Sequence, residues 1–124
     1  TEENHHLIDA KAIETMKPGA VIINTARGKL IDSDALIAGL ESGKLGGAAL
    51  DVLENENGLY YYNRMGDVIP NPELAALRSM PNVILTDHTA FYTEEDVESM
   101  VRGVLESADA FAKGQPTRHD VTNL

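Results

Sequence analysis

The sequence predicts an α/β fold in which three short strands form a parallel sheet and helices cover both of its faces. Apolar runs at residues 20–24, 48–52 and 82–86 have the length and composition of strands that are buried on both sides. Segments with helical periodicity lie before and between these runs, so helices and strands alternate along the chain. We expect right-handed crossovers to join the strands, which places their carboxyl ends at one edge of the sheet.

Capping residues predict where the first two helices begin and end. Asp9 is placed to cap a helix over residues 10–16, and a proline–glycine pair separates that helix from the first strand. Ser33 is placed to cap a second helix over residues 34–42. Gly43 suits the left-handed turn that ends many helices, so the second helix is expected to stop there.

The last two predicted helices differ in length. A short helix over 72–80 lies between a long loop at 53–71 and the third strand. The final helix is expected to cover 93–113, with Thr93 as its N-cap, acidic residues in its first turn and Gly114 ending it. Its apolar side chains recur at helical spacing on one stripe, formed by Val97, Met100, Val101, Val104, Leu105, Ala108, Phe111 and Ala112.

Composition excludes several classes of partner. Twenty acidic and ten basic residues give a formal net charge of −10, which repels phosphate backbones and anionic lipid surfaces. No apolar run approaches the roughly 20 residues that span a bilayer. We therefore expect neither nucleic acid nor a membrane as a partner. The sequence contains no cysteine, and its beginning lacks the pattern of a signal peptide, so we expect a cytoplasmic protein.

Polar residues that could carry chemistry follow each predicted strand. In open parallel sheets, ligands bind outside the carboxyl ends of the strands. Arg27 follows the first strand, and its planar, permanently charged guanidinium can hold a carboxylate through two hydrogen bonds. The other strand ends supply two carboxylates and a titratable imidazole, from Asp51, Glu56 and His88. Together these groups predict an enzyme site at this edge.

Three segments make a family resemblance specific. "NTARGKLID", "GGAALDVLENE" and "MPNVILTDHTAFYT" resemble the C-terminal part of the NAD-binding domain of D-isomer-specific 2-hydroxyacid dehydrogenases, most closely the D-lactate dehydrogenase branch. The spacing also matches, since 24, 5 and 32 positions separate Arg27, Asp51, Glu56 and His88. The resemblance implies a Rossmann-like fold, NAD as cofactor and reversible hydride transfer between NADH and a small 2-oxo acid such as pyruvate. It also implies a homodimer in the full-length protein.

The resemblance assigns a role to each of these residues. Arg27 would bind the substrate carboxylate and polarise its keto oxygen, His88 would exchange the proton, and Glu56 would orient and charge that histidine. The residues expected to contact the cofactor are Asn4, Thr25, Ala26, Arg27, Asp51, His88 and Ala90, with Asp51 on the nicotinamide carboxamide. The residues expected to contact the substrate are Arg27, His88 and Phe91.

The sequence departs from this family pattern in two places. Asp87 stands where the family usually has proline before the catalytic histidine. The chain also contains no G-x-G-x-x-G turn, which is the part of the fold that binds pyrophosphate. We therefore interpret residues 1–113 as the C-terminal part of the NAD-binding domain, residues 114–124 as a tail, and the chain alone as an inactive fragment. The choice between NAD and NADP and the identity of the 2-oxo acid stay open.

Two other classes of protein share part of this pattern. A non-catalytic, dinucleotide-sensing relative of the corepressor type would keep the fold, although this chain retains every catalytic position. A receiver-type signalling domain is also acidic and α/β, and Asp51 followed by Thr86 resembles its phosphoacceptor arrangement. The cation at Arg27 stands where that domain needs carboxylates for Mg²⁺, which argues against it.

Two further groups are predicted to be structural. His5 and His6 suggest a metal site, but adjacent positions on a helix point about 100° apart and the sequence offers no third ligand nearby. We therefore predict no metal. Tyr60, Tyr61 and Tyr62 are expected to pack locally or to line a dimer contact.

Overall fold

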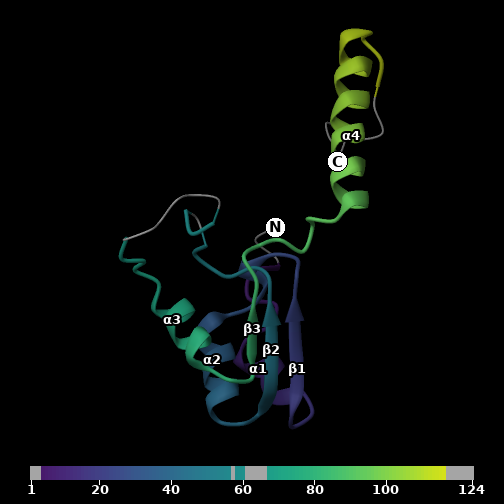
Figure 1. Cartoon of the computed structure of the whole chain (residues 1–124). Coiled ribbons are helices and arrows are strands. Elements are labelled where there is room, and N and C mark those ends of the chain that lie inside the picture. The colour runs from purple at the N-terminus through teal and green to yellow at the C-terminus, as the bar shows by residue number, and fades with distance from the viewer. Residues whose placement is uncertain (1–3, 57, 61–66, 117–124) are drawn as a thin grey trace. The chain divides into compact units, whose positions relative to one another are not determined.

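The computed structural model describes residues 4–56, 58–60 and 67–116 and contains a parallel three-stranded sheet in the order β1-β2-β3 (Figure 1). The strands are β1 (Ala20–Asn24), β2 (Leu45–Leu50) and β3 (Val83–Leu85). The helices are α1 (Ala10–Thr15), α2 (Ser33–Glu41), α3 (Pro72–Ser79) and α4 (Glu94–Ala112), with a short 3₁₀ turn, η2 (Gly28–Leu30), after β1. The chain divides into two compact units, Thr1–Thr89 and Ala90–Leu124.

The core of the first unit lies between the sheet and helices α1, α2 and α3. One buried cluster joins them, formed by Ile13, Ile22, Ile31, Leu36, Leu40, Leu45, Ala48, Leu50, Leu53, Leu74 and Leu77. The strands follow one another across the sheet in chain order, and crossovers of the same hand then place their helices on the same face. The prediction of a parallel α/β fold is confirmed.

No helix among the described residues of the first unit covers the opposite face of this sheet, so the prediction of helices on both faces is wrong for this part of the chain. Val21, Ile23 and Ile84 are exposed by 62%, 72% and 66%. Side chains alternate between the two faces of a strand, and these three point away from the core. In doubly wound sheets, the chain moves across the sheet first one way and then the other, and the helices of the second half cover the second face. Here β1, β2 and β3 follow one another in a single direction, so α2 and α3 lie on the same face.

The structure corrects two predicted element boundaries. The cap of α2 is Asp32, whose Oδ1 accepts a hydrogen bond from the Ala35 amide at 3.1 Å, and not Ser33. Strand β2 begins earlier than expected, at Leu45, and ends before Asp51. Its start is hidden in the sequence by Gly46 and Gly47, which are poor strand formers. Both are needed, since a Cβ atom at either position would lie under 3 Å from a neighbouring carbonyl oxygen.

The second unit consists of the long helix α4 and the residues around it. The Thr93 hydroxyl accepts a hydrogen bond from the Asp96 amide at 3.1 Å, and Gly114 has a left-handed φ of 64°, so the predicted cap and stop are confirmed. The apolar stripe is exposed at Met100, Val101, Val104, Leu105 and Phe111. No helix within the described ranges is long and apolar enough to cross a membrane.

Candidate active site

Asp51 connects the carboxyl ends of the three strands through its backbone amide and its buried carboxylate. The backbone amide of Asp51, just after β2, donates to the carbonyl of Asn24 at the end of β1 at 2.9 Å. The Asp51 carboxylate accepts hydrogen bonds from the Thr86 hydroxyl and from the Thr89 amide, the latter at 2.8 Å, both beyond β3. Asp51 is only 4% exposed. Because a buried carboxylate must be satisfied by donors, these bonds hold the three strand ends in register.

Asn24 shapes the loop that carries Arg27. Its side-chain oxygen accepts from the Ala26 amide at 3.1 Å, and its side-chain nitrogen donates to the Arg27 carbonyl at 2.9 Å. The Arg27 side chain is exposed and donates to the Ala26 carbonyl at 2.6 Å. The strand therefore ends in a folded loop that carries the guanidinium at the carboxyl edge of the sheet.

Gly28 brings this loop against the turn that follows Asp51. A Cβ atom at Gly28 would lie 2.0 Å from the carbonyl oxygen of Leu53 and 2.6 Å from the amide nitrogen of Glu54. No side chain fits between these two backbone segments. The glycine after Arg27 is thus required for contact between the end of β1 and residues 53–56.

Glu56 and His88 form the contact that the family resemblance implied. The Glu56 Oε1 atom lies 3.1 Å from Nδ1 of His88, and its Oε2 atom accepts from the Leu53 amide at 2.8 Å. The two side chains are 20% and 28% exposed. His88 has a left-handed φ of 54°, a conformation that is uncommon outside glycine and that clusters at functional sites. The carboxylate is therefore fixed at both oxygens and orients the imidazole.

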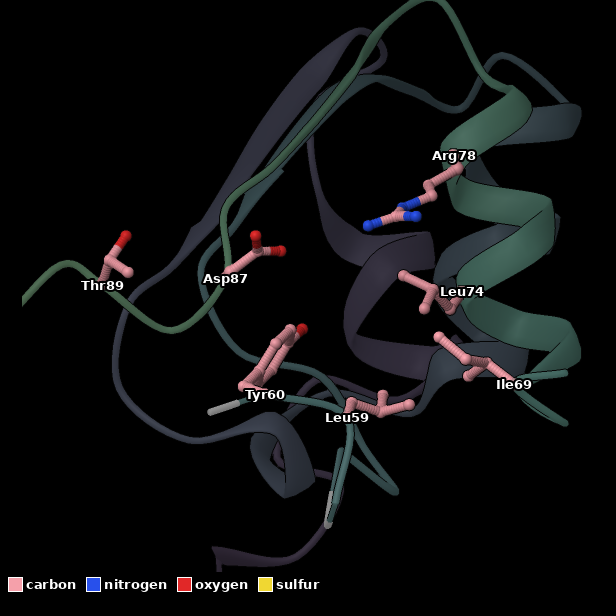
Figure 2. Close-up of a pocket in the computed structure, with 7 residues that line it drawn as sticks. All are labelled: Leu59, Tyr60, Ile69, Leu74, Arg78, Asp87 and Thr89. Atoms are coloured by element: carbon pink, nitrogen blue, oxygen red, sulfur yellow. The ribbon is translucent and has the colours of Figure 1, made fainter. Parts of the chain in front are cut away.

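An open cavity lies next to this pair. It has a volume of about 330 Å³, and Figure 2 shows the side chains that line it: Leu59, Tyr60, Ile69, Leu74, Arg78, Asp87 and Thr89. The Arg78 guanidinium points toward Asp87 across it. The Tyr60 ring also meets the His88 ring edge-to-face, with centroids 6.4 Å apart. Burial, followed by the nearby charges of Glu56 and Asp87, raises the pKa of the Tyr60 phenol.

A second polar cluster joins Glu54 of the 53–56 turn to His5 and His6. His6 Nε2 is 2.8 Å from Oε1 of Glu54, and His5 Nε2 is 3.9 Å from the same oxygen. The hydrogen bond with Glu54 raises the pKa of His6. Burial would raise the pKa of Glu54, but hydrogen bonds from His6 and Ser33 outweigh it and lower that pKa. The expectation that the two histidines lack a third ligand nearby is therefore wrong.

The structure places the other predicted residues as follows. Asn4, Thr25 and Ala26 are exposed, and the last two lie at the carboxyl end of β1. Ala90 and Phe91 belong to the second unit, where the Phe91 ring meets Tyr92 edge-to-face with centroids 6.2 Å apart. Tyr61 and Tyr62 lie outside the described residues.

Sequence reasoning missed three residues at this edge of the sheet. Asn24 and Glu54 organise the loops, and Tyr60 contacts the histidine ring. For Asn24 a signal was present, since an asparagine at the end of a strand often folds the following turn.

Comparison with known proteins gives the family. The model of "D-isomer specific 2-hydroxyacid dehydrogenase, NAD binding domain" matches residues 1–90. An aromatic 2-oxoacid reductase from Clostridium sporogenes is 49% identical over 111 residues, which are 90% of this chain and 34% of the relative. A D-lactate dehydrogenase from Leuconostoc mesenteroides subsp. cremoris is 48% identical over 113 residues, 91% of this chain and 34% of the relative.

Solved structures agree with these relatives. The crystal structure of a D-lactate dehydrogenase from Treponema pallidum matches with a TM-score of 0.90 and 39% identity, and the match covers 98% of this chain and 37% of that one. The NAD-complexed form of a D-isomer specific 2-hydroxyacid dehydrogenase from Lactobacillus delbrueckii ssp. bulgaricus has a TM-score of 0.86 and 36% identity, with 95% and 36% covered. The chain thus spans about a third of the length of these relatives. Because the family model covers most of it, the chain belongs to the D-isomer-specific 2-hydroxyacid dehydrogenases, and the matched part to their NAD-binding domain.

Proposed function

We propose that the intact protein containing this chain reduces a small 2-oxo acid to the D-2-hydroxy acid with NADH, with pyruvate and D-lactate as its substrate pair. The observation that carries the proposal is the 3.1 Å contact between Glu56 and His88 at the carboxyl edge of the sheet. The names of the relatives, which include D-lactate dehydrogenases and an aromatic 2-oxoacid reductase, support the same chemistry. Membership in this family leaves the receiver-type alternative without support.

The geometry of His88 suits a general acid. Its Nδ1 atom faces Glu56, so Nε2 is the nitrogen that would donate a proton to the substrate oxygen. Reduction of a keto carbon by hydride leaves an alkoxide, which needs one proton to become the hydroxyl group. Glu56 keeps the ring in place, because its second oxygen is bound to the Leu53 amide.

The described residues fit the nicotinamide end of a dinucleotide. Asn24 holds the loop so that Thr25 and Ala26 are exposed at the edge where dinucleotides bind in such sheets, and the Asp51 carboxylate lies at the next strand end. We infer that Thr25, Ala26 and Asp51 contact the cofactor. NADH, when bound, supplies the hydride.

The oligomeric state and the cellular location of the intact protein are inferred from the sequence. We infer a homodimer from the family resemblance. A cytoplasmic location is inferred from the acidic, cysteine-free sequence.

The proposal is tested by NADH oxidation with pyruvate in the intact protein, comparing Glu56→Gln with the wild type. The amide keeps the size of the side chain but removes the charge that faces His88. We expect kcat to fall at least about tenfold, within the contribution of a positioned acid–base group, with KM for pyruvate nearly unchanged. Chiral analysis of the product should show D-lactate. Phenylpyruvate, assayed in parallel, tests whether an aromatic side chain is preferred.

Glu41→Gln is the matched control, because Glu41 is an exposed glutamate at the end of α2. Its kinetics should equal those of the wild type. If the wild type binds NADH but turns over neither 2-oxo acid, the protein is a dinucleotide sensor of the corepressor type and the proposed activity is wrong.

Arg27→Lys should selectively weaken the use of substrates that carry a carboxylate. Lysine keeps the charge but loses the planar fork that can form two parallel hydrogen bonds. Losing one charge-assisted hydrogen bond should raise KM for pyruvate about tenfold. Steady-state kinetics with pyruvate and with uncharged pyruvamide measure the effect. An equal loss for both substrates would show that Arg27 does not bind the carboxylate.

A further inference from the structure

His5, His6 and Glu54 bring three potential metal ligands together outside the proposed active site. One ligand atom from each residue lies within 4.8 Å of the others. The two imidazole rings are stacked, with centroids 3.9 Å apart and an interplanar angle of 27°. His6 has a left-handed φ of 53°, so these neighbours lie in a turn and do not diverge as they would on a helix. Neither acid–base catalysis nor substrate binding uses this cluster.

Backbone hydrogen bonds hold the histidine turn in place. The His6 amide donates to the Lys29 carbonyl at 2.9 Å, and the segment continues as a parallel bridge between Ile8 and Ile31. The carboxylate is held separately, since the Ser33 amide and hydroxyl lie 3.3 and 3.2 Å from Oε2 of Glu54. That arrangement directs Oε1 toward both histidines. The three ligands are therefore pre-positioned by two different parts of the fold.

We propose that Nε2 of His5, Nε2 of His6 and Oε1 of Glu54 bind a divalent transition-metal ion such as Zn²⁺. Two imidazoles and one carboxylate, with water in the fourth position, form a common zinc ligand set. Zn–N and Zn–O bonds of about 2.0–2.2 Å place tetrahedral ligands about 3.4 Å apart. The Glu54 oxygen now lies 2.8 and 3.9 Å from the two nitrogens, and the His5 ring must turn out of its stacked arrangement to direct its Nε2 atom at the same ion.

Exposure and neighbouring charge agree with this assignment. The His5 side chain is 51% exposed, which leaves room for a water ligand. The Asp32 Oδ2 atom lies 3.6 Å from Nδ1 of His6, on the side of the ring away from Glu54. Histidine ligands usually direct their second nitrogen at a carboxylate, which fixes the ring and increases its basicity. Nitrogen ligands also favour Zn²⁺, Co²⁺ or Ni²⁺ over Mg²⁺.

The test is calorimetric titration of the metal-free intact protein with Zn²⁺, and with Mg²⁺ for comparison. We expect one Zn²⁺ per chain, no detectable Mg²⁺ binding, and a rise in Tm with Zn²⁺ because the ion binds the folded state. His5→Asn removes one ligand and leaves the bond between His6 and Glu54 in place. It should weaken Zn²⁺ binding at least about tenfold without changing the Tm of the metal-free protein.

Asp32→Asn tests the outer carboxylate. Asparagine caps a helix as well as aspartate does, so α2 should be retained, while Zn²⁺ binding should weaken about tenfold. His88→Asn is the control for binding at the histidine of the proposed active site and should keep the Zn²⁺ affinity of the wild type. The proposal is wrong if the wild type binds no Zn²⁺, if His5→Asn binds it unchanged, or if only His88→Asn abolishes binding.

Discussion

Replacing His88 by asparagine in the intact protein should lower kcat for 2-oxo acid reduction by at least about 100-fold, because a positioned acid–base group contributes about 10²- to 10⁴-fold. Asparagine is the informative substitution at this position. His88 has a φ of 54°, and asparagine is among the few residues that adopt left-handed backbone conformations readily. The loop after β3 should therefore keep its path while the imidazole is lost.

Two measurements separate this chemical effect from a structural one. NADH binding, followed by fluorescence titration, should change little, because the bonds from Thr86 and Thr89 to Asp51 do not involve the His88 side chain. The Tm should also stay close to that of the wild type. A variant that keeps more than about a tenth of the wild-type kcat would rule out His88 as the proton donor.

Replacing Gly28 by alanine should damage both stability and activity. The added methyl group would lie 2.0 Å from the Leu53 carbonyl oxygen, and backbone cannot move aside as a flexible side chain can. Overpacking of this kind costs about 1–3 kcal/mol, occasionally more. The displacement would also separate Arg27 from the turn that carries Glu56, so kcat/KM should fall with the stability. Urea unfolding and steady-state kinetics measure the two effects.

Lys29→Ala is the matched control for this variant. Lys29 is the next residue along the chain, its side chain is exposed, and the carbonyl that accepts from His6 is retained in alanine. It should unfold and turn over like the wild type. If Gly28→Ala did the same, the close packing of the two backbone segments would not be needed for the site.

The local pattern of the sequence determined the elements and the chemistry at their ends. Apolar runs bounded by turn residues predicted the three strands, and Thr93 and Gly114 marked the ends of the long helix. The family resemblance, and no local pattern, paired Glu56 with His88 across 32 positions, and the two side chains lie 3.1 Å apart. Strands and helix ends can be predicted from the sequence because each depends on residues that are close along the chain. The order of the strands in the sheet follows largely from the alternation of strands and helices.

Only the tertiary structure decided the contacts that depend on the path of the loops. It showed that Ser33 donates to Glu54 while Asp32 caps α2, and that Glu54 reaches His6, 48 positions earlier in the chain. It also showed that Gly28 is needed for close packing and not for a left-handed turn. Periodicity and capping describe neighbours along the chain, whereas these contacts arise where separate loops meet in space, so no local pattern specifies them.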